Sequence, residues 1–136
     1  MPDQEPPPDD RSIDGDARLI RAVSRVRWIV DDGAGGLRVA SGAFQDVTDA
    51  EGIRGMSVLL EQTLEELGLD YRAVAAEFSD HALVVVTAEV VRDCGLGVIR
   101  APISGPIGGA HGHVLGKKTP GRQSRLAREC ERLVWP

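Results

Sequence analysis

The chain is poor in aromatic residues, which make up 4% of its 136 residues. Because 42% of the residues are hydrophobic, valine, leucine, isoleucine and alanine must supply most of the core of a folded domain. The sequence has no run of about 18 apolar residues, so we expect no transmembrane helix and no membrane partner. The N-terminus has no apolar segment, so we expect no secretory signal and a cytoplasmic location.

Cysteine is also scarce. The two cysteines, Cys94 and Cys130, lie far apart and form no C-x-x-C or other metal-ligand spacing. This pattern excludes a disulfide framework and a cysteine-based zinc site. We predict that both residues are reduced, half-buried thiols.

Basic residues are fewer than acidic ones, 16 against 21, and the last part of the chain is enriched in them. The formal net charge is −5, and residues 1–16 carry six acidic residues against one arginine. Residues 111–136 carry six basic residues against two acidic ones. The acidic total disfavours a general nucleic-acid binder, although a local basic face keeps nucleic acid as a weaker alternative.

Residues 1–16 contain prolines and acids and almost no apolar side chains, a composition that predicts a disordered leader. Three consecutive prolines favour an extended conformation, so the leader is either a solubilising tail or a regulatory peptide. Residues 17–136 are predicted to form a single α+β domain. The domain is expected to have a small mixed or antiparallel sheet of four to five strands, with three to four helices in one layer on one face.

Hydrophobic periodicity and turn residues place the elements of this domain. Ser57, Asp70, Thr87 and Thr119 are the predicted N-caps, and Phe44 is the predicted core anchor of an irregular loop. Strands are predicted at 26–30, 37–41, 82–87, 96–102 and 111–116, with the first two forming a hairpin. Helical segments are predicted at 17–24, 57–68, 71–78, 88–95 and 120–135.

The motif A-H-G-H-V (110–114) carries the first candidate chemistry. On a strand, His111 and His113 point to the same face, about 7 Å apart along the chain. Imidazole titrates near neutral pH, so we predict both as candidate catalytic acid/base residues. Two histidines alone fall short of a metal site, and no E-x-x-H or C-x-x-C accompanies them. We therefore predict no metal and no cofactor, although Asp80 and His81 could approach in space.

The stretch G-K-K-T-P-G-R (116–122) follows directly. It departs from a Walker A motif because the threonine comes one residue late and the leading glycine is missing. A simpler anion site remains, in which the start of the terminal helix and nearby cations hold a phosphate or carboxylate. The candidate residues are Lys117, Lys118, Arg122 and Arg125. Ser41, a further candidate nucleophile, lacks the G-x-S-x-G context.

A further set of motifs is spread along the chain: R-W (27–28), R-V-A-S-G-A-F-Q-D (38–46), M-S-V (56–58), V-V-T-A (85–88), G-L-G-V-I-R (95–100) and A-H-G-H-V-L-G-K-K-T (110–119). With these motifs the sequence resembles a group of small bacterial proteins of unassigned activity over residues 26–135. The resemblance implies a bacterial source and a common fold, and it implies no chemistry. It also implies that a histidine matching His111 and a lysine pair matching Lys117 and Lys118 recur in the group.

Two classes of function follow from these observations. The first is a small accessory protein that binds a protein or an anionic ligand through the basic C-terminal face. The second is a small enzyme that acts on a phosphate-containing substrate, such as a nuclease or nucleotide-processing enzyme. In the enzyme, a histidine would be the general acid/base and the lysines and arginines would clamp the phosphate.

Overall fold

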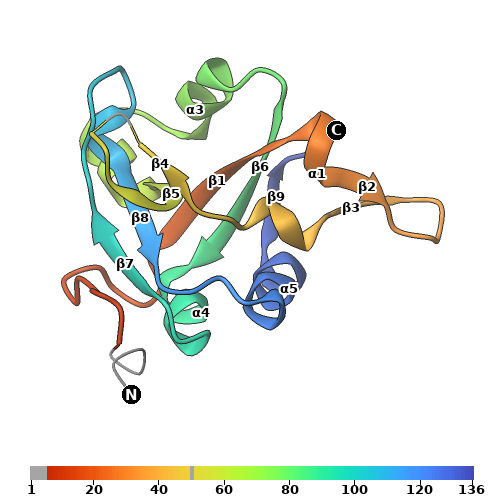
Figure 1. Ribbon diagram of the computed structural model, residues 1–136. Coiled ribbons are helices and arrows are strands. Elements are labelled where there is room, and N and C mark those ends of the chain that lie inside the picture. The colour runs from red at the N-terminus through yellow and green to blue at the C-terminus, as the bar shows by residue number, and fades with distance from the viewer. Residues whose placement is uncertain (1–5, 50) are drawn as a thin grey trace.

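The computed structural model describes residues 6–49 and 51–136 (Figure 1). These residues form nine β-strands, five α-helices and two single-turn 3₁₀ helices. Within this part of the chain, every helix is too short or too polar to cross a lipid bilayer. In chain order the elements are β1 (Arg18–Ser24), α1 (Arg25–Trp28), β2 (Ile29–Asp31), β3 (Leu37–Val39), η2 (Ser41–Ala43), β4 (Val47–Thr48), β5 (Arg54–Leu60), α2 (Glu61–Glu66), α3 (Tyr71–Glu77), β6 (His81–Thr87), α4 (Ala88–Asp93), β7 (Gly97–Arg100), η3 (Gly108–Ala110), β8 (His111–Leu115), α5 (Pro120–Glu129) and β9 (Glu131–Val134).

A single antiparallel sheet organises the protein. Its strand order is β7-β8-β5-β1-β6-β9, and β4 pairs with the first part of β5. Strands β2 and β3 form a separate hairpin that projects to one side (Figure 1). The predicted α+β class is confirmed, but the main sheet has seven strands where four to five were predicted. The extra strands arise from segments predicted as helix or loop.

The core is divided into two clusters that lie on opposite faces of the sheet. Val84 of β6 belongs to the first core cluster and its neighbour Val85 belongs to the second. Helices α4 and α5 add Val91 and Leu126 to the first cluster, whereas Leu64 of α2 packs in the second. The prediction of helices in one layer on one face is therefore wrong. The central strands bury apolar side chains on both faces, and each face needs its own cover.

Segment 17–24 was predicted as a helix and is β1, a strand between β5 and β6. Leu19 and Ile20 are both fully buried, and they point to different core clusters. Two adjacent apolar residues fit one side of a helix and equally fit a strand that is buried on both faces. Periodicity alone could not separate these alternatives.

Segment 57–68 was predicted as one helix capped by Ser57. The structure instead places Ser57 within β5, and the helix α2 begins only at Glu61. Met56 and Val58 enter the first core cluster while Leu59 enters the second, so the run M-S-V-L-L alternates as a strand does. Ser57 therefore lies inside the sheet, beside β8, and not at the start of a helix.

The last predicted helix, 120–135, is also too long. Helix α5 ends at Glu129, and residues 131–134 form β9, which pairs with β6. At the other end of the domain, the strand predicted at 26–30 starts later because α1 occupies its first residues. The predicted hairpin is confirmed by the pairing of β2 with β3.

Several local predictions are confirmed. The side-chain oxygens of Asp70, Thr87 and Thr119 each accept a backbone N–H in the first turn of α3, α4 and α5. Phe44 is fully buried. Both cysteines are free thiols. Turn and cap chemistry is local, so it can be predicted from a few neighbouring residues.

Residues 6–16, which fall in the leader predicted to be disordered, make specific contacts along β7 and α4. The two carboxylate oxygens of Asp9 accept hydrogen bonds from Nε of Arg92 at 3.1 and 3.0 Å. One of them also accepts the backbone N–H of Val98 at 3.0 Å. Ile13 is buried with 2% exposure in the first core cluster. We call this segment the strap; residues 1–5 of the predicted leader lie outside the described residues.

Candidate functional site

Both histidines of the H-x-H motif lie on β8, between β7 and β5. As a strand requires, they point to the same face of the sheet, and their ring centroids are 4.8 Å apart at an interplanar angle of 88°. His111 is 6% exposed and His113 is fully buried. The register of β8 on β5 sets His113 opposite Ser57.

The imidazole of His111 is held at both nitrogens. Nδ1 lies 2.8 Å from the carbonyl oxygen of Ala101, and Nε2 lies 3.1 Å from the Ser57 hydroxyl. A carbonyl oxygen can only accept, so Nδ1 carries the proton and donates it. In the neutral ring, Nε2 is therefore the acceptor of the Ser57 O–H. Ser57 is thus paired with a base, His111, and the Ala101 carbonyl fixes the tautomer of that base.

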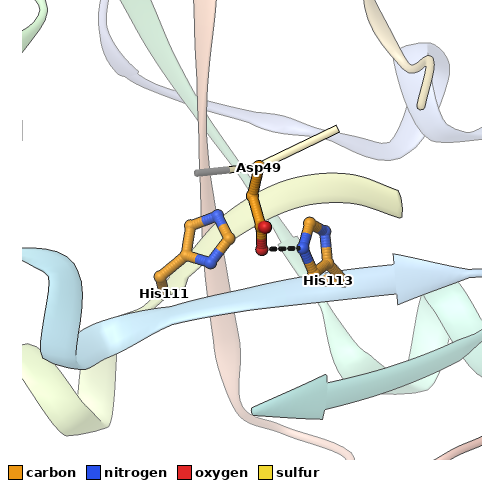
Figure 2. A group of neighbouring side chains, drawn as sticks. All are labelled: Asp49, His111 and His113. Carbon is orange, nitrogen blue, oxygen red and sulfur yellow. Dashed lines mark hydrogen bonds and ion pairs between the residues drawn. The ribbon is translucent and has the colours of Figure 1, made fainter. Parts of the chain in front are cut away.

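His113 is bound to a carboxylate instead. Its Nε2 lies 2.7 Å from Oδ2 of Asp49, which sits beside the two rings (Figure 2). The other carboxylate oxygen of Asp49 accepts the backbone N–H groups of Glu51 and Ile53 at 2.8 and 3.0 Å. The hydrogen bond from His113 is the main cause that lowers the pKa of Asp49, and the two backbone N–H groups add to it. Asp49 is therefore an anchored, ionised carboxylate at neutral pH.

The second nitrogen of His113 has no such partner. Its Nδ1 is buried and makes no hydrogen bond within the described residues. A Cβ atom on Gly55 would come within 2.8 Å of this nitrogen, so the ring packs directly against the backbone of β5. Glycine at this position lets β5 approach the ring closely.

A buried arginine adjoins Ser57. Nη1 of Arg21 donates to the Ser57 carbonyl at 2.7 Å, and Nε and Nη2 donate to the Ala43 carbonyl at 3.3 and 2.9 Å. Burial lowers the pKa of Arg21 to about 10, and the nearby charge of Asp46 opposes that shift. The guanidinium is still cationic at neutral pH, and its hydrogen bonds go to backbone carbonyls, one of them that of Ser57.

These groups open onto one groove with a volume of about 600 Å³. Ser57, His111, Arg21 and Asp49 are among its polar lining residues. Trp28, Phe78 and Ile107 are among its apolar lining residues. The groove therefore combines apolar walls with a few converging polar groups, which is typical of a small-molecule site.

The four predicted anion-binding residues lie elsewhere, and none of them lines the groove. The Lys118 ammonium donates to the Asp46 carboxylate at 2.6 Å and to two backbone carbonyls, and its side chain is 5% exposed. Arg122 donates to the carbonyl of Lys117, and Arg125 pairs with Glu129. The structure thus brings the two histidines together and places the cations apart from them. Anion binding by these residues stays a prediction.

Sequence reasoning missed three residues of this site: Arg21, Asp49 and Ser57. Arg21 and Ser57 were assigned to helices, and their positions in the sheet became apparent only with the strand register. Asp49 lies in the turn between β4 and β5, where its side chain accepts from residues 51 and 53. The turn sequence D-A-E-G is a usable signal for such a side-chain–backbone turn, but it does not reveal a partner on β8.

Comparisons with protein-family models, with curated proteins and with solved structures found no match.

Proposed function

We propose that the protein is a small hydrolase in which Ser57 is the nucleophile and His111 is the general base. The observation that carries the proposal is the 3.1 Å contact from Ser57 Oγ to His111 Nε2, with Nδ1 fixed by the Ala101 carbonyl. Both side chains line the same groove, so a substrate can reach them. A nucleophile within hydrogen-bond reach of an oriented base is the arrangement that acyl-transfer chemistry needs.

The reaction would proceed in two steps on an ester substrate. The Ser57 proton moves to Nε2 as Oγ attacks the carbonyl carbon, and the imidazolium then protonates the departing alcohol. Water, deprotonated by Nε2, next attacks the acyl group, and the proton returns to Oγ as the free acid leaves.

The groove suggests the class of ester. Trp28, Phe78 and Ile107 favour an apolar acyl chain or alcohol, and the volume of about 600 Å³ fits a small molecule. The group that orients His111 is a neutral backbone carbonyl, which stabilises an imidazolium less than a carboxylate does. We therefore expect slow turnover and a preference for esters with good leaving groups.

This proposal keeps the histidine acid/base predicted from the sequence and replaces the phosphate clamp. Of the cations predicted to hold a phosphate, Lys118, Arg122 and Arg125 are engaged with Asp46, the Lys117 carbonyl and Glu129, and none of the four lines the groove. The accessory-protein function through the basic C-terminal face stays a prediction without added support from this geometry.

The test is hydrolysis of p-nitrophenyl esters of increasing chain length, together with labelling by a fluorophosphonate. We expect Ser57→Ala and His111→Ala each to lower kcat by about 100-fold or more, and the phosphonyl group to be found on Ser57 by mass spectrometry. Ser104→Ala is the matched control, because Ser104 also lines the groove but is exposed and makes no hydrogen bond to His111 within the described residues. Full activity in Ser57→Ala, or label on another residue, would contradict the proposal.

A further inference from the structure

The Asp49–His113 pair plays no part in the proposed reaction, although it lies beside His111. One ligand-type atom from each of Asp49, His111 and His113 lies within 4.8 Å of the other two. All three side chains are buried or nearly so: the Asp49 side chain is 2% exposed, and the two histidines are 6% and 0% exposed. Figure 2 shows the carboxylate of Asp49 next to both imidazole rings. We call these three residues the His–Asp cluster.

We propose that the His–Asp cluster binds one divalent ion of the zinc class. Two imidazoles and one carboxylate form a donor set that suits zinc and its first-row neighbours, and that leaves an open coordination position. Metal–ligand bonds of about 2.1 Å in a tetrahedral site place the ligand atoms about 3.4 Å apart. Oδ2 of Asp49 and Nε2 of His113 already lie closer than this, at 2.7 Å. The three ligand atoms lie within 4.8 Å of one another, so the distances to the His111 nitrogen would have to shorten by on the order of 1 Å.

The surroundings of the cluster orient its donor atoms as a metal site requires. His111 donates its Nδ1 proton to the Ala101 carbonyl, which leaves the Nε2 lone pair for an ion. One oxygen of Asp49 accepts two backbone N–H groups, and Oδ2 is directed at the histidines. Both Asp49 and His111 line the groove, which gives an ion a path from solution.

His113 can become a ligand by a change of tautomer. An ion at its Nε2 would take the place of the proton that now bridges to Asp49, and the ring proton would move to Nδ1. That nitrogen has no hydrogen bond to lose within the described residues, but its N–H would be a buried donor without a partner, which weakens the affinity for the ion. The ion therefore substitutes for one hydrogen bond, between Asp49 and His113, and disturbs no other contact of this ring.

The ion and the serine compete for the same lone pair. Nε2 of His111 now accepts the Ser57 O–H, and coordination would take that acceptor away. Zinc should therefore inhibit ester hydrolysis, a consequence that rests on the proposed function. Zinc binding itself does not rest on the proposed function, because it needs only the three side chains of the His–Asp cluster.

Binding is measured on the full chain by titration with Zn²⁺ against a chromophoric chelator, and with Co²⁺ by its visible absorption. We expect one ion per chain, and a loss of affinity of about 100-fold in Asp49→Asn and in His113→Gln. His81→Gln is the matched control, because His81 lines the same groove but lies outside the cluster. Ser57→Ala should bind zinc at least as tightly as the wild type, since the competing hydrogen bond is gone.

The results separate the two proposals. Wild-type protein that binds no stoichiometric zinc, or Asp49→Asn protein that binds it unchanged, overturns the metal site whatever the esterase assay gives. Zinc that binds at the cluster while Ser57-dependent hydrolysis continues unaffected also overturns it, because Nε2 would then not be a ligand. If a cluster variant does not fold, the wild-type protein alone tests the proposed metal site. Its melting temperature must then rise as the zinc concentration rises.

Discussion

Lys117 and Lys118 are neighbours in sequence and have opposite environments. Lys117 is exposed, whereas the Lys118 ammonium is enclosed by the Asp46 carboxylate and the carbonyls of Val114 and Gly116. Burial lowers the pKa of Lys118, and its hydrogen bond to Asp46 opposes the shift. The second lysine thus fastens β8 to the loop that carries Asp46, and the sequence gives no sign of this difference.

We predict that Lys118→Met lowers the free energy of unfolding by about 1–3 kcal/mol, because it removes the charge-assisted hydrogen bond to Asp46 and the bonds to two backbone carbonyls. Lys117→Met is the control and should change stability by less than about 0.5 kcal/mol, as exposed substitutions usually do. Urea denaturation of the two variants measures both values. Equal effects at the two positions would contradict the structural role of Lys118.

At the site, sequence reasoning placed the histidines on one face of a strand because a period of two is a local property. It could not pair His111 with Ser57, since that contact depends on the register between β5 and β8. The same holds for Asp49, which reaches His113 across 64 residues of sequence. Residues that form a motif within one element were predictable, and their partners on other elements were not.

At the scale of elements, the strap shows which neighbours a polar segment contacts. Composition predicts disorder for the leader because it has few apolar residues, and this stays a prediction; the cations that contact the strap lie on α4 and β7. Arg92 binds Asp9 and two strap carbonyls, and Arg100 binds Asp10. A Cβ atom on Gly97 would lie 2.1 Å from the Pro8 carbonyl oxygen, so this glycine permits the close approach of the strap to β7.

The strap also gives a pH prediction. Hydrogen bonds from Ser12, with a smaller contribution from Arg100, lower the pKa of Asp10 below its ordinary 3.8. An acid whose pKa is lower in the folded state stabilises the fold above its ordinary pKa, and this stability is lost as the pH falls through the folded value. The stability difference between wild type and Asp10→Asn should therefore be present at pH 6 and shrink at about pH 3.

Urea denaturation of both proteins at each pH measures this difference, and other titrating groups cancel in the comparison. Asp16→Asn is the control for a substitution in the same segment, because Asp16 is exposed and its carboxylate makes no hydrogen bond within the described residues. A difference that stays constant from pH 6 to pH 3 would show that the Asp10 carboxylate does not hold the strap.

Most of the accurate element predictions rest on local signals. Of the four predicted caps, Asp70, Thr87 and Thr119 are confirmed. Ser57 is not a cap, because it lies within β5. The errors at 17–24 and 57–68 fell on strands buried on both faces, where the apolar pattern resembles that of a helix. These segments become strands because the sheet pairs them, which is information held by the rest of the chain.

At the scale of the whole molecule, one sheet joins the two core clusters. Each central strand contributes alternate side chains to both, so the two clusters share the same strands. Both tryptophans, Trp28 and Trp135, pack against the first core cluster, and Trp28 also lines the groove. Their fluorescence therefore reports on the first cluster and on the groove, whereas circular dichroism reports on all the strands and helices.

We predict that Leu64→Ala, which empties a fully buried site in the second core cluster, lowers the free energy of unfolding by about 2–5 kcal/mol. Because the sheet couples the clusters, the urea midpoint must fall by the same amount in tryptophan fluorescence and in circular dichroism. Leu67→Ala is the control, since Leu67 is 51% exposed and should cost much less. A fluorescence midpoint that stays in place while the circular dichroism midpoint falls would show that the two faces unfold separately.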